Sequence, residues 1–265
     1  MNDAAVKYVV MEAVNTNEDE KHQEHMKELE EKFKEEREKE QEAWDRIYKE
    51  NGENLELSGG WFVLAGTIIT ALGETKDFVQ ETEEGKPAVV TGSAVEAFGN
   101  SLQAIGLAKV YEVERLPPYL TGSVGCWLQA VGNTTNAVAT QIEIQGEEEE
   151  GESLNALGSG VQAYGAYLEA VGNSGLPPFI MQETLITGNS LIAIGSTLDA
   201  IGQIYLLQDK EEAGEILIVA GAWIQVVGAA LEVYAISIRN SYSAFEERSK
   251  EETERYSYAM YRGGR

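Results

Sequence analysis

Residues 125–132 read Gly-Cys-Trp-Leu-Gln-Ala-Val-Gly, and this phrase decides the fold because variants of it recur along the chain. Residues 99–106 read Gly-Asn-Ser-Leu-Gln-Ala-Ile-Gly, and residues 165–172 read Gly-Ala-Tyr-Leu-Glu-Ala-Val-Gly. Each copy has a glycine, an apolar residue three positions later, and a second glycine four positions after that. Spacings of three and four place these residues on one face of an α-helix, whereas a strand would alternate.

The phrase belongs to an internal repeat that is present six times. The central glycines of the six sets are spaced by 33, 33, 33, 30 and 26 residues. A repeat of this length, with helical periodicity inside each unit, predicts an all-α domain. Two Pro-Pro pairs, at 117–118 and 177–178, interrupt the chain between repeats, and short links favour antiparallel neighbours. The expected six helices cover residues 59–73, 91–109, 122–140, 154–172, 184–205 and 214–238.

So many glycines inside helices require a structural reason. Each costs about 1 kcal/mol of helix propensity relative to alanine. We expect the glycines to let antiparallel helices approach more closely than the usual separation of about 8–10 Å. Dispersion contacts and Cα hydrogen bonds between backbones then become available. The residues expected at these contacts are Gly66, Gly73, Gly92, Gly99, Gly106, Gly125, Gly132, Gly158, Gly165, Gly172, Gly188, Gly195, Gly202, Gly221 and Gly228.

Charge divides the chain into three parts. Residues 1–58 carry 18 acidic and 9 basic side chains, residues 59–238 carry 22 and 5, and residues 239–265 carry 5 and 6. We therefore expect a long, charged, helical N-terminal arm, a six-helix glycine-repeat domain, and an aromatic C-terminal tail. Antiparallel alternation would bring connections 74–91, 140–156 and 206–213 to one end of the domain, with 14 acidic and 3 basic side chains.

Composition excludes several functional classes. The net charge of −25 makes nucleic acid an unsuitable partner, because phosphate binding depends on basic patches. Cys126 is the single cysteine and has no histidine in the domain to activate it, while His22 and His25 are expected to be solvated on the arm. These residues provide no disulfide and no usual zinc site. We therefore expect no enzyme activity, no catalytic or metal-binding residues and no cofactor.

Two groups of residues beside the glycines have roles that the sequence leaves open. One group either hydrogen-bonds across helices or marks the solvent margin of each helix: Gln103, Gln129, Glu169, Asp199 and Gln225. The other is aromatic and is expected in core or interface packing rather than in a ligand pocket: Trp61, Trp127, Tyr164, Tyr167 and Trp223.

The phrases at 102–106 and 128–133 resemble those of repetitive glycine-heptad helical proteins of unknown function from Bacillus-type spore-forming bacteria. The resemblance covers residues 59–238. It implies a bacterial origin and offers no active site. The start of the chain lacks a basic segment followed by an apolar run, so no signal peptide is evident. The expected location is the cytoplasm, or a cell or spore surface reached by a non-classical route.

These observations favour a structural, self-assembling protein whose partner is itself, as the subunit of a homopolymeric fibre, sheet or shell. Contact between one subunit and the acidic end of the next would propagate without closing. The expected assembly contacts lie on the arm and the tail: Phe33, Trp44, Arg255, Tyr256, Tyr258, Tyr261 and Arg262.

Two other classes stay open. The first is a membrane-associated or membrane-inserting protein, because glycine at fixed helical spacing also brings transmembrane helices together. The polar residues within 120–142 weigh against this class, since a span needs about 20 mostly apolar residues. The second is a soluble binding module whose acidic loops capture a cation or a basic partner.

Overall fold

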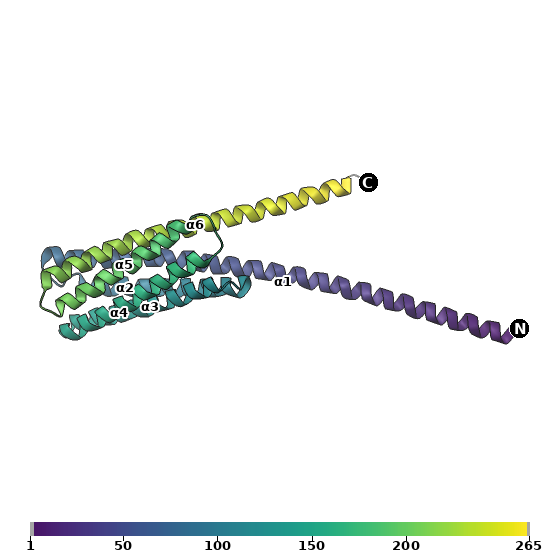
Figure 1. The fold of residues 1–265 in the computed structure, drawn as a ribbon, viewed down its shortest axis with the longest axis horizontal. Coiled ribbons are helices and arrows are strands. Elements are labelled where there is room, and N and C mark those ends of the chain that lie inside the picture. Colours follow the sequence, from purple (N-terminus) through teal and green to yellow (C-terminus); the bar gives the residue numbers. More distant parts are fainter. Residues whose placement is uncertain (1–2, 264–265) are drawn as a thin grey trace. The chain divides into compact units, whose positions relative to one another are not determined.

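The computed structural model describes the backbone of residues 3–263. It describes the side chains of residues 23–260 apart from Glu24, Glu28, Glu247, Glu251, Glu254 and residues 257–259. The described chain is all-α, as the repeat predicts, with six helices and no strand (Figure 1). These are α1 (Asp3–Gln80), α2 (Lys86–Glu114), α3 (Pro117–Ile144), α4 (Glu148–Gly175), α5 (Gln182–Leu206) and α6 (Glu211–Gly263).

The helices are longer than the repeat alone predicts. α1 runs without a break through the expected arm and the first repeat helix, and α6 continues through the expected tail. The connections are correspondingly short, and each contains one residue with a positive φ angle that turns the chain sharply. These residues are Glu81, Arg115, Gly146, Met181 and Asp209, with φ between 51° and 91°. Only one of them is a glycine, so the sequence carries little signal for where the turns begin.

The chain divides into two compact units, residues 1–48 and residues 49–265. In the first unit α1 is a charged helix, on which Lys34 pairs with Glu38 at 3.9 Å. Its aromatic side chains Phe33 and Trp44 are 59% and 65% exposed. The second unit begins ten residues before the expected domain start of 59, because Gly52 already lies against the backbone of α2.

In the second unit, α1 and α2 pair through facing glycines. A Cβ atom added to Gly66 would lie 2.7 Å from the carbonyl oxygen of Gly92. A Cβ atom added to Gly99 would lie 2.6 Å from the carbonyl oxygen of Gly59. Such distances are shorter than real Cβ contacts, so only hydrogen fits at these positions. Each step of seven residues along α1 is matched by a step of seven back along α2, which fixes the register of the hairpin.

The hairpins α3–α4 and α5–α6 repeat this arrangement. A Cβ atom on Gly132 would lie 2.6 Å from the carbonyl oxygen of Gly158, and one on Gly195 would lie 2.5 Å from that of Gly221. The three hairpins are therefore built by the same contact, in which backbone replaces side chain at the helix crossing.

The three hairpins close into a ring. α2 packs on α3, where Ser123 Oγ donates a hydrogen bond of 2.8 Å to the carbonyl oxygen of Ala104, and α4 packs on α5. α6 returns to α1, where Trp223 Nε1 donates to Thr75 Oγ1 at 3.0 Å. Each helix thus has two neighbours, and the six helices enclose a common interior.

Candidate functional site

Polar side chains fill much of this interior. The residue after each repeat glycine and the fourth residue after it both face inward. On α2 these positions hold Ser93 and Glu96, then Asn100 and Gln103, and all four side chains are buried. Buried polar side chains in the described residues are about as numerous as buried apolar ones. They are Glu56, Thr67, Ser93, Glu96, Asn100, Gln103, Ser123, Gln129, Asn133, Asn136, Thr140, Glu143, Asn155, Ser159, Gln162, Glu169, Asn173, Asn189, Ser196, Gln203, Gln225 and Glu232.

Apolar side chains cover the outside of the ring. The second and sixth residues after a repeat glycine face outward, as Trp127 and Val131 do with 46% and 56% exposure. On every helix this outer face includes a stretch in which no charged side chain is exposed. Together these stretches form what we call the apolar belt: residues 54–73, 87–108, 117–142, 153–175, 184–206 and 216–238. A water-soluble bundle has the opposite distribution, with its charged faces in water.

Three described helices are long and apolar enough to cross a membrane, judged by length and composition. They lie within His25–Gln80, Gln182–Leu206 and Glu211–Lys250. The average hydropathy of α2, α3 and α4 is lowered by their inward polar residues, although the outer faces of these helices carry no exposed charge within the belt.

The inward polar side chains hydrogen-bond across helices. Gln129 Nε2 donates to Glu169 Oε2 at 2.7 Å, and Gln103 Nε2 donates to Glu232 Oε1. Two further bonds converge on α4, Ser159 Oγ to Asp199 Oδ2 at 2.7 Å and Gln162 Nε2 to Gln225 Oε1 at 2.9 Å. The five polar residues whose role the sequence left open therefore make interhelical hydrogen bonds and do not mark a solvent margin.

The interior is not polar throughout. Val63, Ala166, Ile192 and Ala229, from four helices, form a buried apolar cluster with exposures of at most 3%. The described interior is therefore a packed bundle with polar compartments rather than an open pore.

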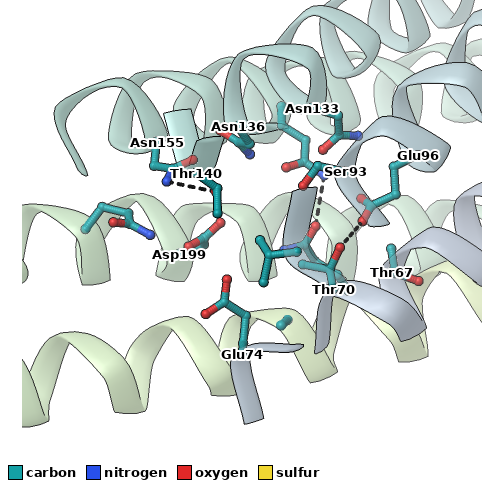
Figure 2. Close-up of a pocket in the computed structure, with 15 residues that line it drawn as sticks. Thr67, Thr70, Glu74, Ser93, Glu96, Asn133, Asn136, Thr140, Asn155 and Asp199 are labelled. Carbon is teal, nitrogen blue, oxygen red and sulfur yellow. Dashed lines mark hydrogen bonds between the residues drawn. The ribbon is translucent and has the colours of Figure 1, made fainter. Parts of the chain in front are cut away.

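A small cavity of about 30 Å³, which we call the inner chamber, is lined by residues from all six helices (Figure 2). Three carboxyl groups, those of Glu74, Glu96 and Asp199, line it, and none of the lining residues is basic. Thr70 Oγ1 donates a hydrogen bond of 2.9 Å to Glu96 Oε1. In Figure 2, the side chain of Glu74, on α1, extends into the cavity on the side where Asp199, on α5, lies. The volume is enough for about two water-sized species.

A second cavity of about 270 Å³, which we call the mouth, adjoins the inner chamber and shares Glu74, Thr140, Asn155 and Gln203 with it. Residues from all three connections expected at the acidic end line it, which confirms that these connections meet. Lys86 is the single basic residue among those lining the mouth, and the acidic ones are Glu74, Asp77, Glu83, Glu143, Glu148, Glu152, Glu211 and Glu215.

Lys86 joins two of these acidic residues at the mouth. Its Nζ lies 2.8 Å from Glu83 Oε1 and 3.4 Å from Glu143 Oε2. Burial raises the pKa of the Glu143 carboxyl, although the charge of Lys86 and a 2.6 Å hydrogen bond from Asn155 Nδ2 oppose that shift. Burial likewise raises the pKa of Asp77, against a hydrogen bond from a backbone N–H. These two carboxyls hold their protons to higher pH than they would in water.

Several buried polar atoms of the interior have no hydrogen-bond partner in the described structure. Three of them belong to side chains that line the inner chamber: Asn133 Nδ2, Asn136 Oδ1 and Gln203 Oε1. An unpartnered buried polar atom costs about 1–3 kcal/mol. Three around one cavity indicate a compartment suited to water or to a polar solute.

The glycines predicted from the sequence all lie where a Cβ atom would meet a backbone carbonyl oxygen of a neighbouring helix at 2.5–2.9 Å. Gly52, Gly85 and Gly151 were missed and also face neighbouring helices. The signal was present, since each stands seven residues before a glycine of the repeat, Gly59, Gly92 or Gly158.

Other predicted residues lie outside the interior. The five aromatic residues beside the glycines are 42–57% exposed, so their expected packing in a core is wrong, and an interface role for them stays a prediction. Arg255 and Tyr256 are exposed on α6, and the side chains of Tyr258, Tyr261 and Arg262 lie outside the described residues. Cys126 is fully buried. No group of three His, Cys, Asp or Glu in the described part of the chain is placed to hold a metal ion.

Comparison with known proteins identifies a family whose function is unknown. A model described as a family of unknown function (DUF6944) matches residues 54–233, which span most of the six helices of the bundle. No curated protein and no solved structure matches the chain.

Proposed function

The chain belongs to this family of unknown function, and we propose that it is a membrane-embedded helical bundle that takes a small polar solute into its interior from its acidic end. The observation that carries the proposal is the apolar belt around a polar interior. Contiguous apolar surface larger than a few hundred Å² is rare on soluble monomers and marks a membrane or protein interface. A belt shared by all six helices surrounds the bundle, whereas a contact with one partner would need only one face.

The height of the belt fits a bilayer. Each stretch of the belt contains about 20 residues or more, and at 1.5 Å per residue this corresponds to about 30 Å, the thickness of a hydrocarbon core. Charged residues resume at both ends, as in the Lys49–Glu114 ion pair of 2.5 Å at one end and the Lys86–Glu83 ion pair of 2.8 Å at the other. This pattern is typical of helices that cross a membrane and end in water.

Close glycine contacts suit a bundle that lies in lipid. Apolar side chains gain little from leaving lipid for a helix interface, so helices associate through close van der Waals packing and interhelical hydrogen bonds. The bundle has both, in facing pairs such as Gly132 and Gly158 and in bonds such as Gln129 to Glu169.

The polar residues within 120–142 no longer oppose insertion. Most of them, including Gln129, Asn133 and Asn136, are buried and face the interior rather than the surrounding medium. Thr134 is exposed, but a threonine hydroxyl can bond to the carbonyl one turn earlier, as its Oγ1 does to Ala130 at 2.8 Å. The exterior of α3 therefore presents apolar groups and satisfied hydroxyls, apart from the amide of Gln141, which is exposed one residue before the belt ends.

Membrane flotation tests the proposal. The full-length protein should remain in membranes washed with alkaline carbonate and should float with liposomes after reconstitution. Substituting Val131→Lys in the belt should reduce insertion, because a lysine at the centre of a span costs about 2.5–3.5 kcal/mol. The matched control is Gln145→Lys, which adds the same side chain at an exposed position outside the belt and should have no effect. A monodisperse protein that stays in solution without detergent would overturn the proposal.

Self-assembly remains a second candidate because exposed apolar side chains also lie outside the belt. Phe33 and Trp44 on the arm, and Tyr256 and Met260 near the end of α6, are 59–81% exposed. Contacts between copies through these segments would cover them. Negative-stain microscopy of the wild type and of a Phe33→Ala, Trp44→Ala double variant tests this role. Regular assemblies that the double variant lacks would support it, and single particles in both would contradict it.

A further inference from the structure

The inner chamber has the chemistry of a cation site. Its polar lining consists of carboxyl, amide and hydroxyl groups from six helices, with no basic side chain among the lining residues. In Figure 2, the Glu74 side chain extends into the space beside Asp199. Among the described residues, Ser159 Oγ donates to Asp199 at 2.7 Å, and Gln203 also forms a hydrogen bond with Asp199. Two neighbouring carboxyl groups in a partly buried cavity are unfavourable when both are ionised, and a bound proton or cation relieves the repulsion.

Unpartnered side-chain atoms around the chamber give an independent indication of a ligand. Asn136 Oδ1 and Gln203 Oε1 are buried acceptors without a donor, on side chains that are each 7% exposed. Asn133 Nδ2 is a buried donor without an acceptor, on a side chain that is 2% exposed. Asn136 Oδ1 lies against Gly158, where it would clash with an added Cβ, so Gln203 Oε1 is the vacant acceptor that suits a cation. The vacant donor suits the oxygen of a water molecule that accompanies the cation.

Deepening the proposed function, we infer that the solute of the inner chamber is a small monovalent cation such as Na⁺, held between Glu74 and Asp199 and completed by neutral oxygens. Oxygen ligands without nitrogen or sulfur select hard cations. Calcium sites gather several carboxylates, and in the described residues no three acidic side chains converge on one point. A volume of about 30 Å³ accommodates a small ion with about one water and excludes large organic cations.

The mouth supplies the route to the chamber. Eight acidic side chains and a single lysine line it, and Lys86 is already paired with Glu83 and Glu143. A cleft lined by one sign of charge raises the local concentration of ions of the opposite sign. The residues shared by the two cavities, Thr140, Asn155 and Gln203 among them, form the passage from the mouth to the chamber.

Thermal unfolding of the purified full-length protein, in NaCl and in choline chloride at equal ionic strength, tests the inference. With Na⁺ at about ten times its Kd, the melting temperature should rise by about 3–5 °C over choline. Glu74→Gln and Asp199→Asn keep the shape of each side chain but remove its charge, and each should abolish the difference. Glu212→Gln removes an exposed acid that does not line either cavity and should leave the difference unchanged.

Titration calorimetry of the unaltered protein with NaCl keeps the test valid where a variant fails to fold, and it should show saturable binding. Equal melting temperatures in Na⁺ and choline, a difference that survives both chamber variants, or a larger shift with Ca²⁺ would each overturn the inference. The measurement does not depend on a bilayer. A protein that proves soluble without detergent can be tested in plain buffer, so failure of the membrane proposal and failure of the cation site are separate results.

Discussion

At the scale of the residue, the fold depends on hydrogen atoms at the helix crossings. Gly132 lies so close to α4 that an added Cβ would be 2.6 Å from a carbonyl oxygen and 2.8 Å from the backbone nitrogen of Gln162. Both of these atoms belong to the backbone of α4, so no flexible side chain could move aside to make room for the added Cβ. Gly160, in α4 itself, has no atom within 4 Å of the corresponding position. The two glycines therefore differ in what they contribute, although both are helical.

Gly132→Ala and Gly160→Ala should have opposite effects on stability. The first forces two helices apart and should lower the free energy of unfolding by about 1–3 kcal/mol. The second replaces a poor helix former at an open position and should raise it by about 0.5–1 kcal/mol. Thermal unfolding followed by circular dichroism measures both. Equal effects of the two substitutions would show that the glycine contacts are not what holds the hairpin.

The sequence predicted residues at this scale unevenly. The seven-residue period identified the glycines because a helix repeats its face with that spacing. The buried polar positions were less visible, because Asn100, Asn133 and Asn189 are residues usually found at the surface. Their common place directly after a glycine was the available signal. That these asparagines lie in the interior became clear only from the ring of six helices. The sequence of one helix does not show which of its faces will be enclosed by the neighbouring helices.

At the scale of the element, each helix end is set by contacts that no local motif records. The expected tail at 239–265 does not begin where the bundle ends. Arg239 Nη2 lies 2.6 Å from Glu56 Oε2, and Asn240 Nδ2 donates to the carbonyl oxygen of Glu53 at 3.2 Å. The side chain of Glu56 is buried, so Arg239 supplies its counter-charge. The bundle therefore continues past the end of the repeat.

Two truncations of α6 should behave differently. Ending the chain after Glu246 keeps both contacts and should leave the melting temperature nearly unchanged. Ending it after Ile238 leaves the Glu56 carboxylate buried without Arg239, which should cost about 3–5 kcal/mol. Differential scanning calorimetry of the two truncated proteins and the full chain measures this. Similar stability of the two truncated proteins would contradict the assigned end of the bundle.

The connections at the acidic end make stability depend on pH. Because burial raises the folded-state pKa of Glu143 above its unfolded value, the folded protein binds the proton more tightly. The stabilisation that comes from protonating Glu143 is therefore present at low pH and is lost as pH rises through the folded-state pKa of Glu143. We expect the melting temperature to rise as pH falls from neutral toward about 5, with a smaller rise in Glu143→Gln. Glu150→Gln, at an exposed position, is the control, and an unchanged profile in Glu143→Gln would contradict the assignment.

At the scale of the whole molecule, the bundle reverses the usual arrangement of polar and apolar side chains. The sequence predicted six antiparallel helices and an acidic end. It did not predict which medium surrounds them, because Trp127 and Gln129 lie on one short stretch yet face opposite sides. A hydropathy average over the helix adds the outward apolar residues to the inward polar ones and so hides the difference between the two faces. The ring separates them, since it determines which face of each helix is enclosed.

For the proposed membrane-embedded bundle, the distribution of basic residues predicts an orientation. An even number of spans places the segment before the first span and the segment after the last span on the same side of the membrane. Within about 20 residues of the spans, the acidic side has Lys76, Lys86 and Lys210. The other side has eleven basic residues: Lys34, Arg37, Lys39, Arg46, Lys49, Lys109, Arg115, Arg239, Arg248, Lys250 and Arg255. Basic flanks favour the cytoplasm, so the mouth should face outward.

Cysteine labelling of intact cells tests that orientation. In a Cys126→Ser background, a cysteine replacing Glu148 at the mouth should react with a membrane-impermeant maleimide. A cysteine replacing Tyr256 should react only after the cells are opened. The reverse pattern would invert the assigned topology, and labelling of both in intact cells would show that the chain does not span the membrane in one orientation.

The central claim is that the apolar belt faces lipid, and tryptophan fluorescence tests it most directly. Trp61, Trp127 and Trp223 all lie on the outer surface with 42–55% exposure, and a Trp44→Phe background removes the fourth tryptophan. In vesicles whose acyl chains carry bromine, the emission should be strongly quenched, while iodide in the aqueous phase should have little effect. Efficient quenching by iodide together with no quenching by brominated lipid would place the belt in water and contradict the account.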